Sequence, residues 1–251
     1  MKIKYSDKDF KSFYKKDKHA KSYDIKRSST LKKRIVRSLE RYTATLFLRK
    51  DSKIIEVGVG TGFITERIIK YGTVFGIDTS NVMVQELKNK ITNNSLSLKN
   101  MSLYDKLPSK KFDYAISYRV LMHLNENNII KGLNNLEKSL KDSGLVVVDI
   151  PRKSLFKDLV QFLKKIFVPG EEEHNYTYNE SQIYRMVNKT ENLKIKTLLA
   201  IDHVWLFLPL YLVFNSFKDN DYLKRLILMI ERKLIYFYSF STRWIVICEK
   251  Q

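Results

Sequence analysis

Cysteine is almost absent from this sequence, because Cys248 is the single one in 251 residues. No internal disulfide can form, and a zinc site made of several cysteines is excluded. Cys248 falls in the apolar run 244–248, which predicts a buried strand with the thiol as a small core side chain. Glycine and proline are also scarce, at 8 and 4 residues, so long flexible linkers are not expected.

Long hydrophobic runs are missing as well. The longest candidate, 204–214, contains Pro209 and falls well short of the ~20 apolar residues that cross a bilayer. Residues 1–5 lack the apolar core of a signal peptide. We therefore expect a cytoplasmic protein, and 44% hydrophobic residues in a chain of this length can form one substantial core.

Acidic residues are few: 27 stand against 46 lysines and arginines, which gives a net charge of +19. Residues 1–50 alone hold 17 basic and 5 acidic side chains, so +12 of the charge lies there. Such a field attracts nucleic acid, acidic lipid headgroups or a phosphorylated substrate. A lysine-rich composition without any specific partner is the alternative.

Segments typical of strands and helices alternate along the chain, which predicts an α/β fold with a parallel sheet. Strands are expected at 53–57, 73–77, 96–101, 112–117, 144–149, 193–201 and 243–249. Helices are expected at 28–48, 63–70, 80–92, 127–141 and 179–188. Ser28 or Ser29 could cap the first of these helices.

The stretch 205–240, between the last two strands, is unusually apolar. Its second half, 221–238, is amphipathic, and its polar side is predicted to carry Asp221, Lys224, Arg225, Glu231 and Arg232. This pattern is typical of a lid over a substrate pocket or of ordinary packing against the domain. It is also typical of a basic helix that lies on a membrane surface.

The pattern that says most about function is a glycine-rich turn after a short apolar strand. Glu56 ends this strand region, and Gly58, Gly60 and Gly62 follow at every second position. Asp78 comes sixteen residues after Gly62, at the end of a second apolar run. Glycines let the backbone approach a ligand, and the acid can bind ribose hydroxyls, so the pattern predicts a nucleotide-type cofactor site. A strand-to-helix turn without a ligand is the alternative.

These residues resemble the first motifs of the class I S-adenosylmethionine-dependent methyltransferases, closest to the group that methylates small molecules and lipid-like substrates. The resemblance covers about residues 20–249, is strongest over 53–124 and weakens after Pro151. It implies a Rossmann-like, doubly wound, seven-stranded, mostly parallel sheet with an antiparallel last strand. It also implies a basic N-terminal cap segment, 1–27, a methyltransferase domain, 28–251, and a helical insertion, 203–241, between strands six and seven.

The resemblance implies S-adenosylmethionine as the cofactor. Glu56 and the glycines would surround its methionine part, Asp78 would bind the ribose hydroxyls, and Met83 would pack on adenine. The complete set of implied cofactor residues is Tyr23, Glu56, Gly58, Gly60, Gly62, Asp78, Thr79, Met83, Leu103, Tyr104, Ser117 and Tyr118.

One position departs from the family pattern. The family often carries an acid shortly before a Leu-Pro pair, where it contacts the adenine amino group. Leu103 and Tyr104 stand at that place here, and Asp105 is shifted by two residues. Either the backbone amide of Leu103 serves adenine alone, or Tyr104 contributes.

Arg119, His123 and His174 are the candidate substrate residues. The two histidines are also candidate general bases, because an oxygen or carbon acceptor can require one. A hydrogen-bonded structural role is the alternative for each histidine. His174 follows the acidic run 171–173, but no second histidine stands at metal-ligand spacing, so no metal is expected.

Three functions remain open at this point. The first is methyl transfer to a small-molecule or lipid-like acceptor, which the apolar stretch 205–240 favours. Peripheral contact with the inner face of an anionic membrane is compatible with this function. The second is an RNA methyltransferase that uses the basic N-terminal region, although no recognised RNA-binding motif accompanies that charge. The third is a non-catalytic cofactor-binding subunit. The sequence at 117–120 is not the Asn-Pro-Pro-Tyr type used in amino methylation, and a buried Cys248 disfavours a cysteine nucleophile.

Overall fold

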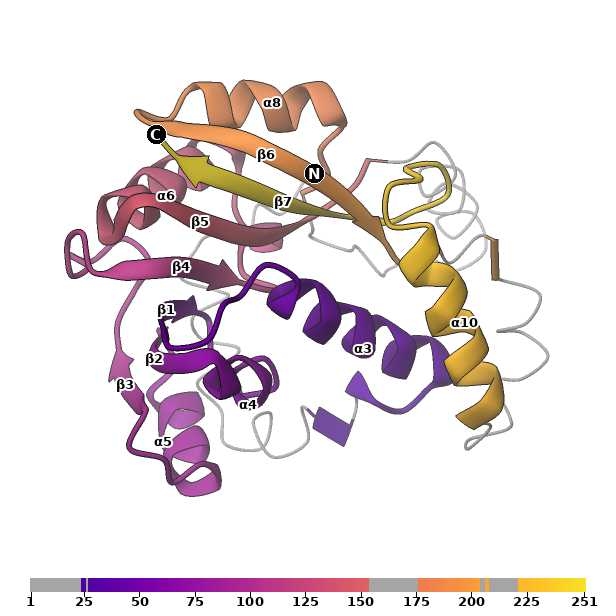
Figure 1. Cartoon of the computed structure of the whole chain (residues 1–251), viewed down its shortest axis with the longest axis horizontal. Helices are drawn as coiled ribbons and strands as arrows, with labels where there is room; N and C mark the ends of the chain where they lie inside the picture. The colour runs from indigo at the N-terminus through magenta and orange to yellow at the C-terminus, as the bar shows by residue number, and fades with distance from the viewer. Residues whose placement is uncertain (1–23, 26, 154–175, 204–205, 208–220) are drawn as a thin grey trace, which may run out of the picture.

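A computed structural model describes residues 24–25, 27–153, 176–203, 206–207 and 221–251. Its strands are β1 (Ser52–Val57), β2 (Gly72–Asp78), β3 (Leu96–Asn100), β4 (Phe112–Ser117), β5 (Leu140–Pro151), β6 (Leu193–Ile201) and β7 (Arg243–Lys250). They form a seven-stranded sheet in the order β3-β2-β1-β4-β5-β7-β6 (Figure 1). Neighbouring strands are parallel except at β7, which is antiparallel to β5 and β6. The predicted Rossmann-like sheet with an antiparallel last strand is confirmed.

The helices of the described residues are α3 (Leu31–Thr45), α4 (Thr65–Ile68), α5 (Asn81–Lys90), α6 (Glu126–Ser139), α8 (Glu180–Asn188) and α10 (Asp221–Lys233). Two short 3₁₀ turns, η1 (Ile69–Tyr71) and η2 (Leu121–His123), accompany them. The helix predicted at 63–70 is therefore split between α4 and η1. The helix expected at 127–141 forms as α6, and the single turn η2 lies between β4 and α6.

Two further boundaries differ from the prediction. The cap of α3 is Thr30 rather than Ser28 or Ser29, because the Thr30 hydroxyl accepts a hydrogen bond from the Lys33 backbone amide at 3.3 Å. Strand β5 begins at Leu140, before a left-handed residue, Ser143, at φ 61°. The sequence predicted a helix as far as 141 and a strand from 144, but the pairing of Leu140 with Phe112 starts the strand earlier.

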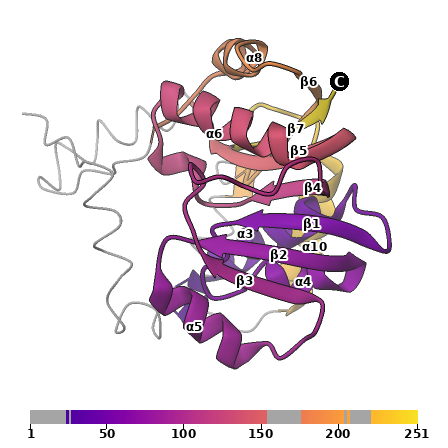
Figure 2. The same cartoon turned by 90° about the vertical axis from the view of Figure 1, so that its left-hand side faces the viewer.

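Apolar residues alternate between the two faces of the sheet because successive strand side chains point in opposite directions. Ile55 joins a core beneath α6 and α8, and its neighbour Ile54 joins a second core beneath α3, α4 and α10. Figure 2 shows the sheet between these helices. Cys248 is fully buried in the first core, as predicted.

The insertion between β6 and β7 is described only in part. Its helix α10 packs against α3, with Leu223 and Ile227 buried and the Arg232 guanidinium 4.6 Å from the centre of the Tyr42 ring. The predicted cap segment 1–27 lies almost wholly outside the described residues, as do 204–205 and 208–220. Among the helices that the structure describes, none is long and apolar enough to cross a membrane.

Parallel strands place their carboxyl ends at one edge of the sheet, where ligands bind in folds of this kind. Strands β1, β2 and β4 are neighbours in the sheet, and their carboxyl ends carry the glycine-rich turn, Asp78 and Tyr118 respectively. The fold therefore brings together the motifs that the sequence analysis singled out.

Candidate functional site

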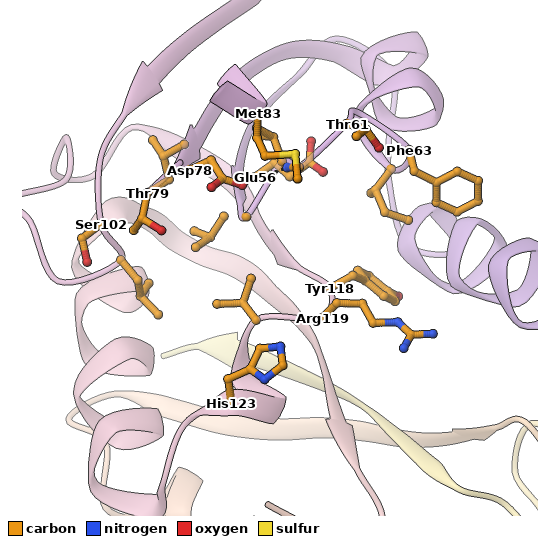
Figure 3. A pocket seen from close by; sticks show the side chains of 18 of the residues that line it. Glu56, Thr61, Phe63, Asp78, Thr79, Met83, Ser102, Tyr118, Arg119 and His123 are labelled. Carbon is orange, nitrogen blue, oxygen red and sulfur yellow. Dashed lines mark hydrogen bonds between the residues drawn. The ribbon is translucent and has the colours of Figure 1, made fainter. Parts of the chain in front are cut away.

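A cavity of about 270 Å³ lies at this carboxyl edge. Its walls come from the glycine-rich turn after β1, the ends of β2 and β4, the segment after β3 and one side of α3 (Figure 3). The residues predicted from sequence that line it are Glu56, Gly58, Gly60, Asp78, Thr79, Met83, Leu103, Tyr104, Tyr118, Arg119 and His123. Tyr23 and His174 lie outside the described residues, so their predicted roles stay predictions.

Two glycines of the glycine-rich turn have different structural roles. Gly60 has φ 51°, and a Cβ added there would meet nothing within 4 Å, so its backbone borders open space in the cavity. Gly62 has φ 84°, and a Cβ there would lie 2.2 Å from Leu87 Cδ1 of α5. Gly62 therefore serves helix packing and does not line the cavity.

Asp78 ties the turn to the end of β2. Its Oδ2 accepts a hydrogen bond from the Gly60 amide at 2.9 Å, and its Oδ1 accepts one from the Ser80 amide at 2.8 Å. Burial raises the pKa of Asp78, and the backbone amides oppose this rise because they favour the carboxylate. The carboxylate thus borders the cavity while it holds the turn in place.

Glu56 lies deeper, with 3% of its surface exposed. Its Oε2 accepts a hydrogen bond from Thr65 Oγ1 at 2.6 Å, at the start of α4. Burial raises the pKa of Glu56 to about 8; the Thr65 hydroxyl opposes this rise, and the charge of Asp78 adds to it. Glu56 is therefore a carboxyl group that titrates near neutral pH beside the turn.

The end of β4 places Ser117 and Tyr118 differently from each other. Ser117 is fully buried, and its hydroxyl donates to the Val57 carbonyl at 3.1 Å, so it joins β1 to β4 behind the cavity wall. Tyr118 lines the cavity, and its hydroxyl lies 2.8 Å from Thr43 Oγ1 of α3. Burial raises the pKa of Tyr118, which keeps the phenol neutral.

The wall after β3 is formed by residues 101–104 together with Met83 of α5. Met101 and Ser102 line the cavity although the sequence analysis did not single them out. Asp105 does not line the cavity. Its Oδ2 instead accepts a hydrogen bond from the Ser102 amide at 2.7 Å. This acid, which is shifted by two residues from its place in the family pattern, therefore stabilises the local turn.

Sequence reasoning named Arg119 but missed the charged residues that surround it on the α3 side of the cavity. Glu40 is 2% exposed, and its Oε1 lies 2.6 Å from Arg119 Nε and 3.7 Å from Arg27 Nη2, and is also paired with Arg243. Burial alone would raise the pKa of Glu40, but the charges of Arg119, Arg243 and Arg27 outweigh it and hold the pKa at about 2. One feature of the sequence could have revealed this group, because Glu40 is an acid on the apolar face of a predicted helix.

His123, in η2, borders the same part of the cavity. Burial, together with the charge of Arg119, lowers the pKa of His123 to about 4. The imidazole is therefore neutral at pH 7 and able to accept a proton, although the low pKa makes it a weak base. In the part of the chain that the structure describes, no group of three or more histidine, cysteine or acidic side chains is placed to hold a metal ion.

Comparison with known proteins gives this site a family context. Residues 54–144 match the family model described as a methyltransferase domain. The malonyl-[acyl-carrier protein] O-methyltransferase of Priestia megaterium is 25% identical over 144 residues, which cover 56% of this chain and 51% of the relative. The chain therefore spans about half the length of the first curated relatives that it matches.

Two solved structures share the fold. The magnesium protoporphyrin IX methyltransferase from Synechocystis, with bound SAH, superposes with a TM-score of 0.59 at 14% identity over 88% of this chain and 83% of its own. Phosphoethanolamine N-methyltransferase 2 from Haemonchus contortus, in complex with S-adenosyl-L-methionine, gives a TM-score of 0.59 at 15% identity, over 85% of this chain and 52% of its own. At these identities the likeness carries the fold alone.

Proposed function

We propose that this chain, which belongs to the class I S-adenosylmethionine-dependent methyltransferases, transfers a methyl group to a small-molecule or lipid-like acceptor. The observation that carries the proposal is the cavity itself. Gly60 leaves space where a Cβ would project, and the carboxylate of Asp78 borders that space. This arrangement fits a nucleoside ligand with ribose hydroxyls. SAH and S-adenosyl-L-methionine are bound by two proteins of the same fold.

The cofactor supplies an electrophilic methyl group on a positively charged sulfur. The residues of this chain would bind it, orient it and keep water away. Asp78 would accept hydrogen bonds from the ribose hydroxyls, and Met83 and Leu103 would pack around the base. Burial raises the pKa of Glu56 to about 8, and the positively charged end of the cofactor beside the turn would shift this carboxyl group towards its carboxylate form. Positioning of two reactants can contribute roughly 7–11 kcal/mol to catalysis, so a chain with few catalytic groups can still be an enzyme.

The acceptor class is supported by the surface around α10. Several large apolar side chains are exposed there, with Tyr222 at 77%, Tyr236 at 65% and Met229 at 51%. Basic residues such as Arg225 and Lys233 share the exposed face of α10. Exposed aromatic and basic side chains together are typical of contact with an anionic membrane surface. An acceptor delivered from such a surface would be lipid-like.

Radiolabelled methyl transfer into a fractionated extract of a bacterial host tests the reaction. Label in the organic or small-molecule fraction supports the proposal. Asp78→Ala, which removes the expected ribose contact, should abolish the labelling. Label that appears only in RNA would instead support the RNA methyltransferase, which the charge of +12 in residues 1–50 favours. Binding of S-adenosylhomocysteine without any transfer would support a non-catalytic subunit.

Partition onto vesicles with anionic lipid tests the membrane contact. The double variant Tyr222→Ser, Met229→Ser should partition several-fold less than the parent protein, because it removes apolar area from the exposed face. Tyr184→Ser, at a 44%-exposed tyrosine of α8, is the matched control and should partition like the parent. Equal partition of all three proteins would rule out α10 as the contact.

A further inference from the structure

The glycine-rich turn, residues 58–62, is held from two sides. On the cavity side, the Gly60 amide donates to Asp78 Oδ2 at 2.9 Å. On the outer side, Lys90 Nζ donates to the Thr61 carbonyl at 3.2 Å, and Lys90 is the last residue of α5. Gly60 and Thr61 line the cavity, whereas Lys90 does not. A side chain outside the cavity therefore holds backbone that borders it.

One backbone amide of the turn is left for a ligand. The amides of Gly58, Val59, Gly60 and Gly62 each donate to an acceptor in β2 or in the turn itself. For the Thr61 amide, no acceptor is found among the residues that the structure describes. An amide without a protein acceptor requires water or a ligand in its place. The orientation of the peptides around Thr61 therefore matters for what the cavity binds.

Lys90 is directed towards the turn by acidic side chains from two other elements. Its Nζ lies 2.7 Å from Glu66 Oε1 of α4 and 3.7 Å from Asp24 Oδ2, in the segment before α3. Glu66 is shared with Arg41 of α3, whose Nη2 lies 2.6 Å from Glu66 Oε2. These four side chains are about one third exposed or more, so each ion pair alone contributes little to stability. Together the ion pairs restrict where the lysine side chain can point.

The residue after the turn, Phe63, is held from the outside as well. Arg41 Nε donates to the Phe63 carbonyl at 2.9 Å. The guanidinium groups of Arg41 and Arg37 lie 3.9 Å and 3.6 Å from the centre of the Phe63 ring. Figure 3 shows Thr61 and Phe63 on the same side of the cavity. The chain on either side of Gly62 is thus fixed by cations, Lys90 of α5 before it and arginines of α3 after it.

We propose that Lys90 is a positioning residue for the cofactor, because it holds the Thr61 peptide in the orientation that binds S-adenosylmethionine. Gly60 and Gly62, on either side, have φ 51° and 84°, and glycine rotates more freely than any other residue. Without the hydrogen bond from Lys90, the turn populates other conformations, and the apparent affinity falls with the fraction that can still bind. The proposal rests on the proposed function, since it places the cofactor in this cavity.

Calorimetric titration with S-adenosylhomocysteine tests this role. Lys90→Met keeps most of the apolar side chain but removes the donor and the charge, and it should weaken binding about threefold to tenfold, as expected for one partly exposed charge-assisted hydrogen bond. Lys90→Arg keeps a donor of similar reach and should bind within about twofold of the parent. Lys88→Met is the matched control, because Lys88 is an exposed lysine in the same last turn of α5. It loses the same charge and should bind as the parent does.

Further measurements separate positioning from a general loss of stability. The melting temperature of Lys90→Met should stay close to that of the parent, because the ion pairs it removes are partly exposed. Hydrogen exchange without ligand should become at least about threefold faster at the Gly60 and Gly62 amides and stay unchanged in α6. Glu66→Gln leaves the contact between Lys90 and the Thr61 carbonyl in place, so it should weaken S-adenosylhomocysteine less than Lys90→Met does.

Three results would overturn the assignment. Lys90→Met could bind S-adenosylhomocysteine as the parent does, or Lys88→Met could weaken it equally, which would make the charge of α5 responsible. Glu66→Gln could also weaken it as much as Lys90→Met, which would assign the effect to the ion pair with α4. Failure of the proposed function has a different signature: S-adenosylhomocysteine does not bind the parent protein at all. Exchange at the Gly60 and Gly62 amides then still decides whether Lys90 holds the turn.

Discussion

At the scale of single residues, Glu56 makes stability depend on pH. Its pKa in the folded protein is about 8, against an ordinary value of 4.5, because burial disfavours the carboxylate. Because the pKa is raised, the stability that the bound proton contributes is fully present below pH 4.5 and is lost as the pH rises from there to about 8. We predict that the parent protein loses this contribution, on the order of a few kcal/mol, between pH 5 and pH 8, and that Glu56→Gln does not.

Thermal unfolding across that pH range provides the measurement. The melting temperature of Glu56→Gln minus that of the parent should increase steadily with pH. Glu86→Gln, a change at a half-exposed glutamate of α5, is the control and should follow the parent at every pH. A difference between Glu56→Gln and the parent that stays constant from pH 5 to pH 8 would contradict the assignment.

Gly60 and Gly62 provide a matched pair of alanine variants. Both glycines have positive φ, so an alanine at either position must adopt the left-handed conformation, which destabilises the fold by roughly 1–2 kcal/mol. Alanine at 60 meets nothing within 4 Å and projects into the cavity, whereas alanine at 62 collides with Leu87. We predict that Gly60→Ala folds but binds S-adenosylhomocysteine at least tenfold more weakly. Gly62→Ala should be the less stable of the two in thermal unfolding.

The site residues that belong to a short sequence motif could be predicted. Glu56, Gly60 and Asp78 belong to a local pattern whose spacing fixes their place at the sheet edge, and all three line the cavity. Glu40 and Arg27 could not be placed in this way, because they meet Arg119 only when α3 packs against the end of β4. Contacts between segments distant in sequence depend on helix packing, which no short motif encodes.

At the scale of elements, α10 is attached to the sheet by a buried pair of charged residues. The His203 amide donates to Glu231 Oε1 at 2.9 Å, and His203 Nδ1 lies 2.7 Å from Glu231 Oε2. His203 Nε2 lies 2.6 Å from the Phe237 carbonyl. Both ring nitrogens thus face acceptors, which favours the imidazolium form. Burial lowers the pKa of His203, but Glu231, the Phe237 carbonyl and the charge of Asp202 outweigh it, so the net shift is upward.

We predict that Glu231→Gln destabilises the protein by about 3–5 kcal/mol, because it leaves a buried histidine without its charged partner. Since the pKa of His203 is raised, the pair stabilises the fold at low pH and this contribution is lost as the pH rises through the folded pKa. The stability difference between parent and variant should therefore shrink towards alkaline pH. Chemical denaturation at several pH values measures it.

A surface carboxylate is the control for this pair. Glu191 is 56% exposed and lies 3.1 Å from Lys138 Nζ, so Glu191→Gln should cost less than about 1 kcal/mol. Hydrogen exchange adds a local readout, because Glu231→Gln should speed exchange in α10 more than in α6. Equal losses for the two variants would mean that the buried pair does not hold α10.

Whole elements were predicted more reliably than their ends. All seven strands were expected, and the central strands β1, β4 and β7 are short, almost completely buried apolar runs, a pattern that leaves few alternatives. Helix α10 was expected at 221–238 but ends at Lys233, where the chain turns so that the Phe237 carbonyl reaches His203. A tertiary hydrogen bond determines that turn, and local propensity cannot reveal it.

At the scale of the whole molecule, the net charge and the cavity charge behave differently. The chain carries +19, whereas the cavity is lined by three arginines, Arg27, Arg37 and Arg119, and three acids, Glu40, Glu56 and Asp78. Association with polyanions should therefore depend steeply on salt, because it releases counter-ions from the nucleic acid. For about six phosphate contacts with single-stranded RNA, affinity should fall by roughly two to three orders of magnitude between 50 and 200 mM salt.

We predict that the affinity for S-adenosylhomocysteine, in contrast, changes less than about threefold over the same salt range, because its site is small and nearly balanced in charge. Calorimetry for the small ligand and filter retention for an unstructured RNA give the two slopes. A shallow RNA slope, with binding that survives 200 mM salt and prefers particular sequences, would mean that the basic surface reads RNA specifically. The basic N-terminal fifth would then belong to substrate recognition, and RNA would replace the lipid-like acceptor as the favoured substrate. A steep RNA slope leaves the surface charge as a general attraction to anions, with selectivity set inside the cavity.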